Sequence, residues 1–392
     1  MHEPVFRVDG KDGAARAGRW ATADGEVATP NLLLYTRRGG LLTLTTELRD
    51  SLRPLAQGCQ ICTMQFLNQP DPPIVKEGGG AKKFLNMDGF VTLACNRDCT
   101  SSEYCLTGRR NNDSVSVSIH SGGTKVTPAR YMEVIEALQP SAYITLPDDL
   151  PRPVANNRAR VSVERSQKWA EECMAMQKSL GLGTSQAFFP IMGGTHLEER
   201  IRSSEGASKS AANGFAICGM GCGETDAERV DLLEAITKRL PEGKPRFVSG
   251  LGPPHQILEA VEAGVDLFDC WYIETLCNHG LALSFPLQSK GAASARAAAL
   301  GQDSMKMSLY NVGYRTDKLP LVPGCTCAAC RSHTRAYIHH LLSTHEMLGL
   351  VLLEVHNTHH LLQARPPTGG NETPAECSRV VIQCLLLLAP LR

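Results

Sequence analysis

Three cysteines stand close together in the segment CTCAAC, at Cys325, Cys327 and Cys330. Thiolates this close cannot all pair as disulfides without strain, but they suit a tetrahedral metal ion that takes one more ligand. The downstream segment 334–362 has a helical pattern and offers six candidates for that ligand: His339, His340, His345, His356, His359 and His360. Spacing alone does not choose among them. The alternative is a set of ordinary reduced cysteines beside a histidine-rich helix.

We expect the metal to be zinc, bound by three cysteines and one histidine. A closed site with four protein ligands is structural, because catalytic zinc keeps one coordination position for water. A second set, Cys59 and Cys62 with Cys95 or Cys99, could also bind a metal. Because Cys-x-x-Cys alone is a common pattern, we interpret this second set as buried thiols.

One carboxylate has the position of a nucleophile. Asp269 ends the short apolar run in GVDLFDC. A carboxylate at the end of a buried strand can attack an electrophilic carbon and form a covalent intermediate. The sequence around Asp269 therefore raises the hypothesis of an enzyme.

Composition narrows the class of protein. The 392 residues include 40 Lys and Arg against 40 Asp and Glu, so net charge gives no argument for nucleic acid or membrane as a partner. Fifteen cysteines without a visible signal peptide indicate a reducing, cytosolic compartment. The apolar run VVIQCLLLLAPL near the end is too short for the roughly 20 residues that a membrane-spanning helix needs. We expect a soluble chain.

From about residue 140 onward, strand-like runs alternate with helical patterns. The runs AYITL, AFFPI, GFAIC, RFVSG and VDLFD lie at 142–146, 187–191, 214–218, 246–250 and 265–269. Helices are expected at 129–138, 160–180, 196–208, 257–263 and from Thr225, which has the capping-box partner Glu228. Five β-α units in a row favour a parallel barrel. The competing doubly wound sheet lacks its Gly-x-Gly-x-x-Gly motif here.

Functional residues of such barrels lie where strands end. Besides Asp269, the predicted strand ends carry Asp148, Asp149, 192–194, 218–223 and Gly250.

We divide the chain into a β-rich segment and main barrel (1–288), a low-complexity loop (289–319), a metal-binding subdomain with the final barrel helix (320–362), and a divergent tail (363–392).

Several of these motifs together resemble the tRNA-guanine transglycosylase family. They are CTCAAC, HTRAYIHHLL, the pair His356–Asn357, GFAICGMGCGE and LPEGKPRFVSGLGPPHQILEAVEAGVDLFDC. The resemblance implies an irregular (β/α)8 TIM-type barrel with an inserted zinc-binding subdomain. It implies one structural zinc per chain, with His356 as the fourth ligand. It also implies exchange of guanine at the tRNA wobble position for queuine or its precursor, with Asp269 in the place of the nucleophile and a second aspartate moving the proton.

The sequence departs from the family's active members on several loops. In place of their Asp-Ser-Gly-Gly-[Phe/Tyr]-Gln it has MDGFVTLACNRDC, residues 87–99. Met192 stands where a glutamine is expected, and IET follows the nucleophile in place of PTR. Asp148 is the match to a base-binding aspartate. Such losses are typical of a barrel kept for its shape, and we interpret Asp269 as vestigial.

The resemblance is therefore to non-catalytic subunits of the family, which pair with a catalytic subunit and bind tRNA through the complex. The resemblance implies a cytoplasmic protein. It also allows peripheral association with the mitochondrial outer membrane, although the sequence shows no membrane-binding motif. One alternative is a competent transglycosylase that uses Asp269 with Asp88 or Asp98 as proton acceptor. Another is a protein-interaction scaffold with no role in tRNA. Beyond His360 the resemblance stops.

Overall fold

A computed structural model describes residues 5–41, 43–53, 55–68, 71–100, 112–119, 122–150, 153–285 and 305–363. These residues belong to two compact units. We call residues 5–40 and 57–269 the barrel unit, and residues 41–56 and 270–363 the metal unit.

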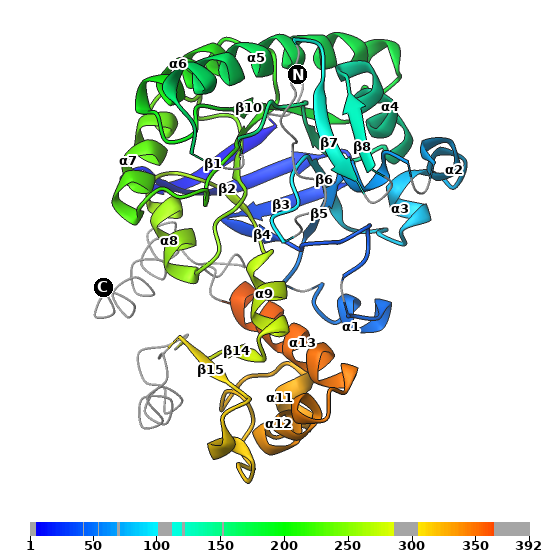
Figure 1. Ribbon diagram of the computed structural model, residues 1–392, viewed down its shortest axis with the longest axis vertical. Coiled ribbons are helices and arrows are strands. Elements are labelled where there is room, and N and C mark those ends of the chain that lie inside the picture. Colours follow the sequence, from blue (N-terminus) through cyan, green and yellow to red (C-terminus); the bar gives the residue numbers. More distant parts are fainter. Residues whose placement is uncertain are drawn as a thin grey trace. The chain divides into compact units, whose positions relative to one another are not determined.

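The barrel unit is built on one ring of eight strands (Figure 1). Along the chain they are β4 (Asn31–Leu33), β5 (Gly58–Cys62), β6 (Val91–Cys95), β9 (Ala142–Ile144), β10 (Gln186–Ile191), β11 (Gly214–Ile217), β12 (Arg246–Val248) and β13 (Leu267–Asp269). Every neighbouring pair is parallel, and β13 pairs with β4. A bridge between Leu34 and Cys59 closes the ring. The predicted TIM-type barrel is confirmed.

Helices cover the outside of this ring (Figure 1). They are α2 (Pro72–Glu77), α3 (Gly80–Phe84), α4 (Pro128–Leu138), α5 (Asn156–Ser179), α6 (Leu197–Ser208), α7 (Asp226–Thr237) and α8 (Pro254–Glu262). The capping box at the start of α7 is confirmed, because Thr225 Oγ1 accepts the Glu228 N–H at 3.3 Å and Glu228 accepts the Thr225 N–H at 2.8 Å. The other helices from α4 onward lie within a few residues of their predicted ranges.

The N-terminal region supplies more of the barrel than its sequence suggests. A three-stranded antiparallel sheet comes first, with β1 (Phe6–Asp12), β2 (Ala15–Thr22) and β3 (Gly25–Thr29). A hairpin of β7 (Val115–Ile119) and β8 (Gly122–Val126) precedes α4. Between them, β4, β5 and β6 are the first three strands of the ring. The prediction of a β-rich segment did not distinguish these barrel strands from the strands outside it.

The metal unit combines short helices with a two-stranded sheet. Its elements are α1 (Thr46–Asp50), α9 (Tyr272–Asn278), β14 (Leu281–Leu283), β15 (Lys306–Ser308), α11 (Ala328–Ser332), α12 (Arg335–Ser343) and α13 (Met347–Gln363). The segment predicted to be helical, 334–362, is interrupted after α12, where His345 has a left-handed φ of 57°. The unit starts before the predicted boundaries at 288 and 320, and residues 286–304 and 364–392 lie outside the described part of the chain.

None of the helices in the described ranges combines the length and apolarity needed to cross a membrane.

A buried ion pair connects β2 to the start of β13. Arg16 Nε donates to Asp266 Oδ1 at 2.7 Å, and both side chains are buried. Asp266 also accepts the N–H of Arg246 at 2.7 Å. The remaining guanidinium hydrogens of Arg16 reach the carbonyls of Glu242 and Lys244. The pair therefore anchors the strand that ends in Asp269.

Replacing Arg16 by Met should lower the free energy of unfolding by about 3–5 kcal/mol, because it leaves the carboxylate of Asp266 buried without its partner. Denaturant unfolding followed by circular dichroism measures this. Arg19→Met is the matched control, since Arg19 pairs with Asp9 at the surface, where a pair contributes roughly 0–1 kcal/mol. Equal losses in the two variants would contradict the assignment.

Candidate functional site

Asp269 lies at the carboxyl end of the barrel, as its place in the sequence predicts. It is the last residue of β13 and is 1% exposed. Its Oδ2 accepts the N–H of Gly250 at 3.2 Å and lies 3.9 Å from the sulfur of Cys99. Its Oδ1 has no hydrogen-bond partner among the described residues. Burial raises the pKa of Asp269 to about 7, so near neutral pH this carboxyl is protonated on a large share of the molecules.

The segment Arg97–Cys99, which follows β6, crosses the carboxyl end of the ring. Arg97 Nη1 donates to the carbonyl of Met220 at 3.2 Å, and Met220 follows β11. A Cβ placed on Gly250, after β12, would lie 3.5 Å from the same Nη1. In the ring order, β11 and β12 lie across the barrel from β6. The guanidinium of Arg97 thus reaches the loops after β11 and β12, and the sulfur of Cys99 lies beside Asp269.

The two alternative proton acceptors are placed differently. Asp88 is exposed in the turn before β6, at the amino end of the barrel and therefore at the opposite end from Asp269. Asp98 lies at the carboxyl end, but its carboxylate accepts hydrogen bonds from Tyr35 at 2.6 Å and Gln65 at 2.7 Å. It also accepts the N–H of Thr100 at 2.9 Å. Its oxygens therefore already have donors on the side of the ring formed by β4 and β5.

Asp148, the match to a base-binding aspartate, is turned toward α5. Its buried carboxylate pairs with Arg158 at 2.6 Å and Arg165 at 3.4 Å. Its neighbour Asp149 faces the barrel end instead, because a Cβ on Gly219 would meet Asp149 Oδ1 at 3.4 Å. The structure therefore places Asp149, and not Asp148, beside the loop that follows β11.

A buried arginine holds two loops of the barrel end together. Arg200 on α6 is 0% exposed, and its guanidinium donates to the carbonyls of Ile191, Gly194 and Cys218 at 2.7–2.8 Å. Gly193, with φ of 137°, passes so close to α6 that a Cβ there would lie 2.7 Å from the backbone nitrogen of Arg200. Met192 is buried in the same loop. Nothing in the sequence marks Arg200 among the arginines of its helix, and it was not predicted.

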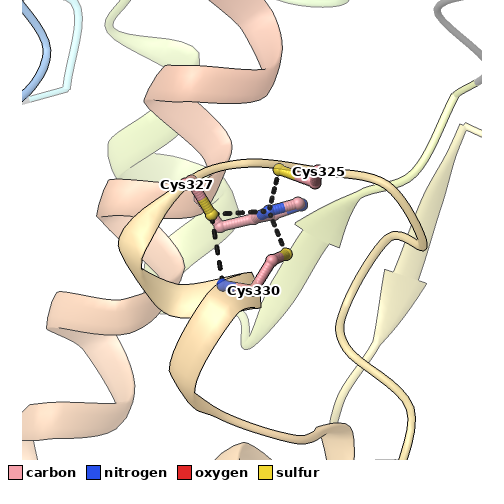
Figure 2. Close-up of side chains that lie close together, drawn as sticks. Cys325, Cys327 and Cys330 are labelled. Atoms are coloured by element: carbon pink, nitrogen blue, oxygen red, sulfur yellow. Dashed lines mark hydrogen bonds between the residues drawn. The ribbon is translucent and has the colours of Figure 1, made fainter.

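The predicted metal ligands meet at one point in the metal unit. The ligand atoms of Cys325, Cys327, Cys330 and His356 all lie within 4.8 Å of one another, and Figure 2 shows the three cysteines converging. His356 Nδ1 is 3.8, 3.6 and 3.3 Å from the three sulfurs in that order. Tetrahedral zinc with ordinary bond lengths would hold sulfur and nitrogen about 3.6 Å apart. The donor set therefore fits zinc in type and spacing.

The ring of His356, the predicted fourth ligand, is oriented by its other nitrogen. His356 Nε2 lies 2.8 Å from the carbonyl of Leu283 in β14, so this nitrogen carries the hydrogen and Nδ1 is available for a metal. The next residue, Asn357, accepts the N–H of Leu283 at 2.8 Å and donates to the carbonyl of Leu281 at 2.9 Å. One turn later, His360 Nε2 lies 2.9 Å from the carbonyl of Phe285. α13 thus carries the predicted ligand and also supplies hydrogen-bond partners for the backbone of residues 281–285.

The second cysteine set lies inside the barrel wall. Cys59, Cys62 and Cys95 are buried in β5 and β6, and Cys62 is the direct register partner of Cys95. A hydrogen bond with Cys62, together with burial, raises the pKa of Cys95 well above its ordinary value. In the described part of the chain, the Cys325 cluster is the one group with metal-binding geometry. Cys59, Cys62 and Cys95 are thus buried thiols, whereas Cys99, the other candidate of this set, is half-buried beside Asp269.

Comparisons with known proteins agree on one family. The sequence profile described as queuine tRNA-ribosyltransferase matches residues 11–365. Queuine tRNA-ribosyltransferase accessory subunit 2 of Gallus gallus is 32% identical over 376 residues, which cover 88% of this chain and 87% of that protein. The protein of that name from Homo sapiens is 32% identical, covering 86% and 88%. A Helicobacter pylori protein named queuine tRNA-ribosyltransferase is 30% identical, covering 91% of each chain.

Replacing Asp269 by Asn should change stability in a way that depends on pH. The folded wild type keeps the proton up to about pH 7, whereas the unfolded chain releases it near 3.9. The wild type therefore loses stability as the pH rises from about 4 to 7, and an uncharged asparagine does not. Relative to that of the wild type, the free energy of unfolding of Asp269→Asn should rise by at most about 3 kcal/mol between pH 5 and pH 8. Urea unfolding at each pH measures this difference.

The control for this experiment is Asp231→Asn, at an exposed position of α7. A stability difference between Asp269→Asn and wild type that stays constant from pH 5 to pH 8 would show that Asp269 does not titrate in this range.

Proposed function

Because this chain belongs to the queuine tRNA-ribosyltransferase family, we propose that it is a non-catalytic accessory subunit that pairs with a catalytic member of that family. The proposed heterodimer exchanges guanine for queuine at the wobble position of tRNAs for aspartate, asparagine, histidine and tyrosine. The accessory chain contributes to binding of the partner and, through the complex, of tRNA. The names of the vertebrate relatives support this assignment.

The observation that carries the proposal is the state of the barrel end. A carboxylate nucleophile must be charged and must reach its electrophile, and a second group must handle the proton. Asp269 is buried, its pKa is raised to about 7, and Cys99 lies against its Oδ2. Arg97 reaches across the barrel end to the carbonyl of Met220. Asp88 lies at the opposite end of the barrel, and the carboxylate of Asp98 accepts hydrogen bonds from Tyr35 and Gln65. We infer that the position of the nucleophile remains while the means to use it are gone.

A competent transglycosylase is the second candidate. It is favoured by the retention of Asp269 at the end of β13 and by the similarity to the Helicobacter pylori protein, whose name contains no accessory subunit. For this candidate to hold, the segment Arg97–Cys99 would have to leave the barrel end when substrate binds.

We propose that Cys325, Cys327, Cys330 and His356 hold one structural zinc ion. With four protein ligands, this zinc would stabilise the fold and leave no coordination position for a reactant. The metal unit is the proposed surface for the partner. Its described residues include several exposed apolar side chains, which are Tyr310, Val312, Leu319, Met347 and Leu348. A cytoplasmic location and peripheral attachment to the mitochondrial outer membrane are proposed from the family resemblance alone.

The first experiment measures exchange of labelled guanine into tRNA. The isolated chain should show no exchange, and the chain expressed with a catalytic subunit should show it. Asp269→Asn in this chain should leave the activity of the complex within about two-fold, because the partner performs the chemistry. Exchange by the isolated chain that disappears in Asp269→Asn would establish the second candidate instead.

The second experiment connects the metal to the partner. Cys327→Ser removes a buried ligand, so zinc content measured by mass spectrometry should fall from one equivalent to near zero. The heterodimer should then be lost on gel filtration. Cys222→Ser, a half-buried cysteine of the barrel unit, should keep both. An intact heterodimer without zinc would count against the metal unit as the partner surface.

A further inference from the structure

A second histidine touches the metal cluster without belonging to its ligand set. His359 lies one turn after His356 on α13, and its Nδ1 is 3.7 Å from the sulfur of Cys325. Among the hydrogen bonds of the described residues, His359 has none to Cys327 or Cys330. His356 Nδ1, in contrast, contacts the sulfurs of all three cysteines. A ligand of a tetrahedral ion must stand near every other ligand. His359 therefore lies outside the first coordination sphere.

The contact of His359 with the proposed thiolate ligand determines which ring nitrogen carries the hydrogen. Its Nε2 lies 3.4 Å from the hydroxyl of Thr326, which can donate to it. A neutral imidazole has one donor and one acceptor nitrogen. A metal-bound thiolate of Cys325 can only accept, so Nδ1 carries the hydrogen and points it at that sulfur, while Nε2 accepts from the hydroxyl of Thr326.

We propose that His359 is a positioning residue of the metal centre, which donates a hydrogen bond to the thiolate of Cys325 and protects that ligand. The inference rests on the proposed zinc site. Three thiolates, one neutral imidazole and Zn²⁺ together carry one net negative charge, which resides on the sulfurs. A hydrogen bond to a charged acceptor is stronger than one between neutral groups.

Cys325 is the ligand that most needs such protection. Cys327 and Cys330 are 3% and 8% exposed, whereas Cys325 is only half-buried. Water, acids and thiol reagents therefore reach the sulfur of Cys325 first. His359 is itself half-buried and stands on this accessible side of the cluster. Its N–H compensates the charge of the one thiolate that protein atoms do not enclose.

The test uses the full zinc-loaded chain with three variants. His359→Leu removes the donor and fills the space. His359→Asn keeps an amide nitrogen at the place of Nδ1. His340→Leu changes an exposed histidine of the same unit and is the control. We measure zinc transfer to a chromogenic chelator and the rate at which iodoacetamide alkylates Cys325, located by peptide mass spectrometry.

Zinc transfer and Cys325 alkylation should both become about 10–100-fold faster in His359→Leu. They should stay near the wild-type rates in His359→Asn and His340→Leu. With Co²⁺ in place of zinc, the thiolate-to-metal absorption band should shift in His359→Leu and return in His359→Asn. A merely space-filling role for His359 would leave His359→Leu unchanged.

The outcomes separate this inference from the proposed zinc site. A wild-type chain that binds no zinc overturns both. A wild-type chain that binds one zinc, with equal transfer rates in all variants, overturns the role of His359 alone. Retention of one zinc in His356→Ala but not in the double variant with His359→Ala would make His359 a ligand and would also overturn the inference.

Discussion

The barrel has no free edge only because its first two strands meet. The N–H of Leu34 donates to the carbonyl of Gly58 at 2.9 Å, and its carbonyl accepts the N–H of Gln60 at 2.8 Å. Unpaired backbone groups at these strands would otherwise offer an edge for association with other chains. Closure also brings the carboxyl ends of all eight strands onto one rim. Only on such a rim can a side chain that follows β6 reach the loops after β11 and β12.

Much of this architecture could be predicted from the sequence, because it depends on local patterns. Alternating apolar runs and helices predicted the ring from β9 to β13, and the pair Thr225 and Glu228 predicted the start of α7. The strands β5 and β6 were not recognised, since each is a five-residue run with cysteines, separated by the short helices α2 and α3. The break at His345 depends on one left-handed residue in an otherwise helical pattern.

The candidate sites differ in the same way. The cluster of Cys325, Cys327, Cys330 and His356 was predictable, because its three cysteines lie within six residues and the resemblance supplied the histidine. The surroundings of Asp269 were not predictable, because Cys99, which follows β6, contacts it from another part of the ring. Such positions follow from tertiary packing between distant segments, which produces no periodic pattern of residues in the sequence. The same is true of Arg200, whose partners are backbone carbonyls and so have no side-chain signature.

The hydrogen bonds between α13 and the segment of β14 join parts of the chain that are more than 70 residues apart. A metal bound by Cys325 and His356 would close a loop within the metal unit, and the bonds of His356, Asn357 and His360 close a longer one back to residues 281–285. Loop closure reduces the conformational freedom of the unfolded chain. Such a centre would act as a cross-link of the kind that disulfides provide in secreted proteins, but one that chelation would remove and a reducing agent would not.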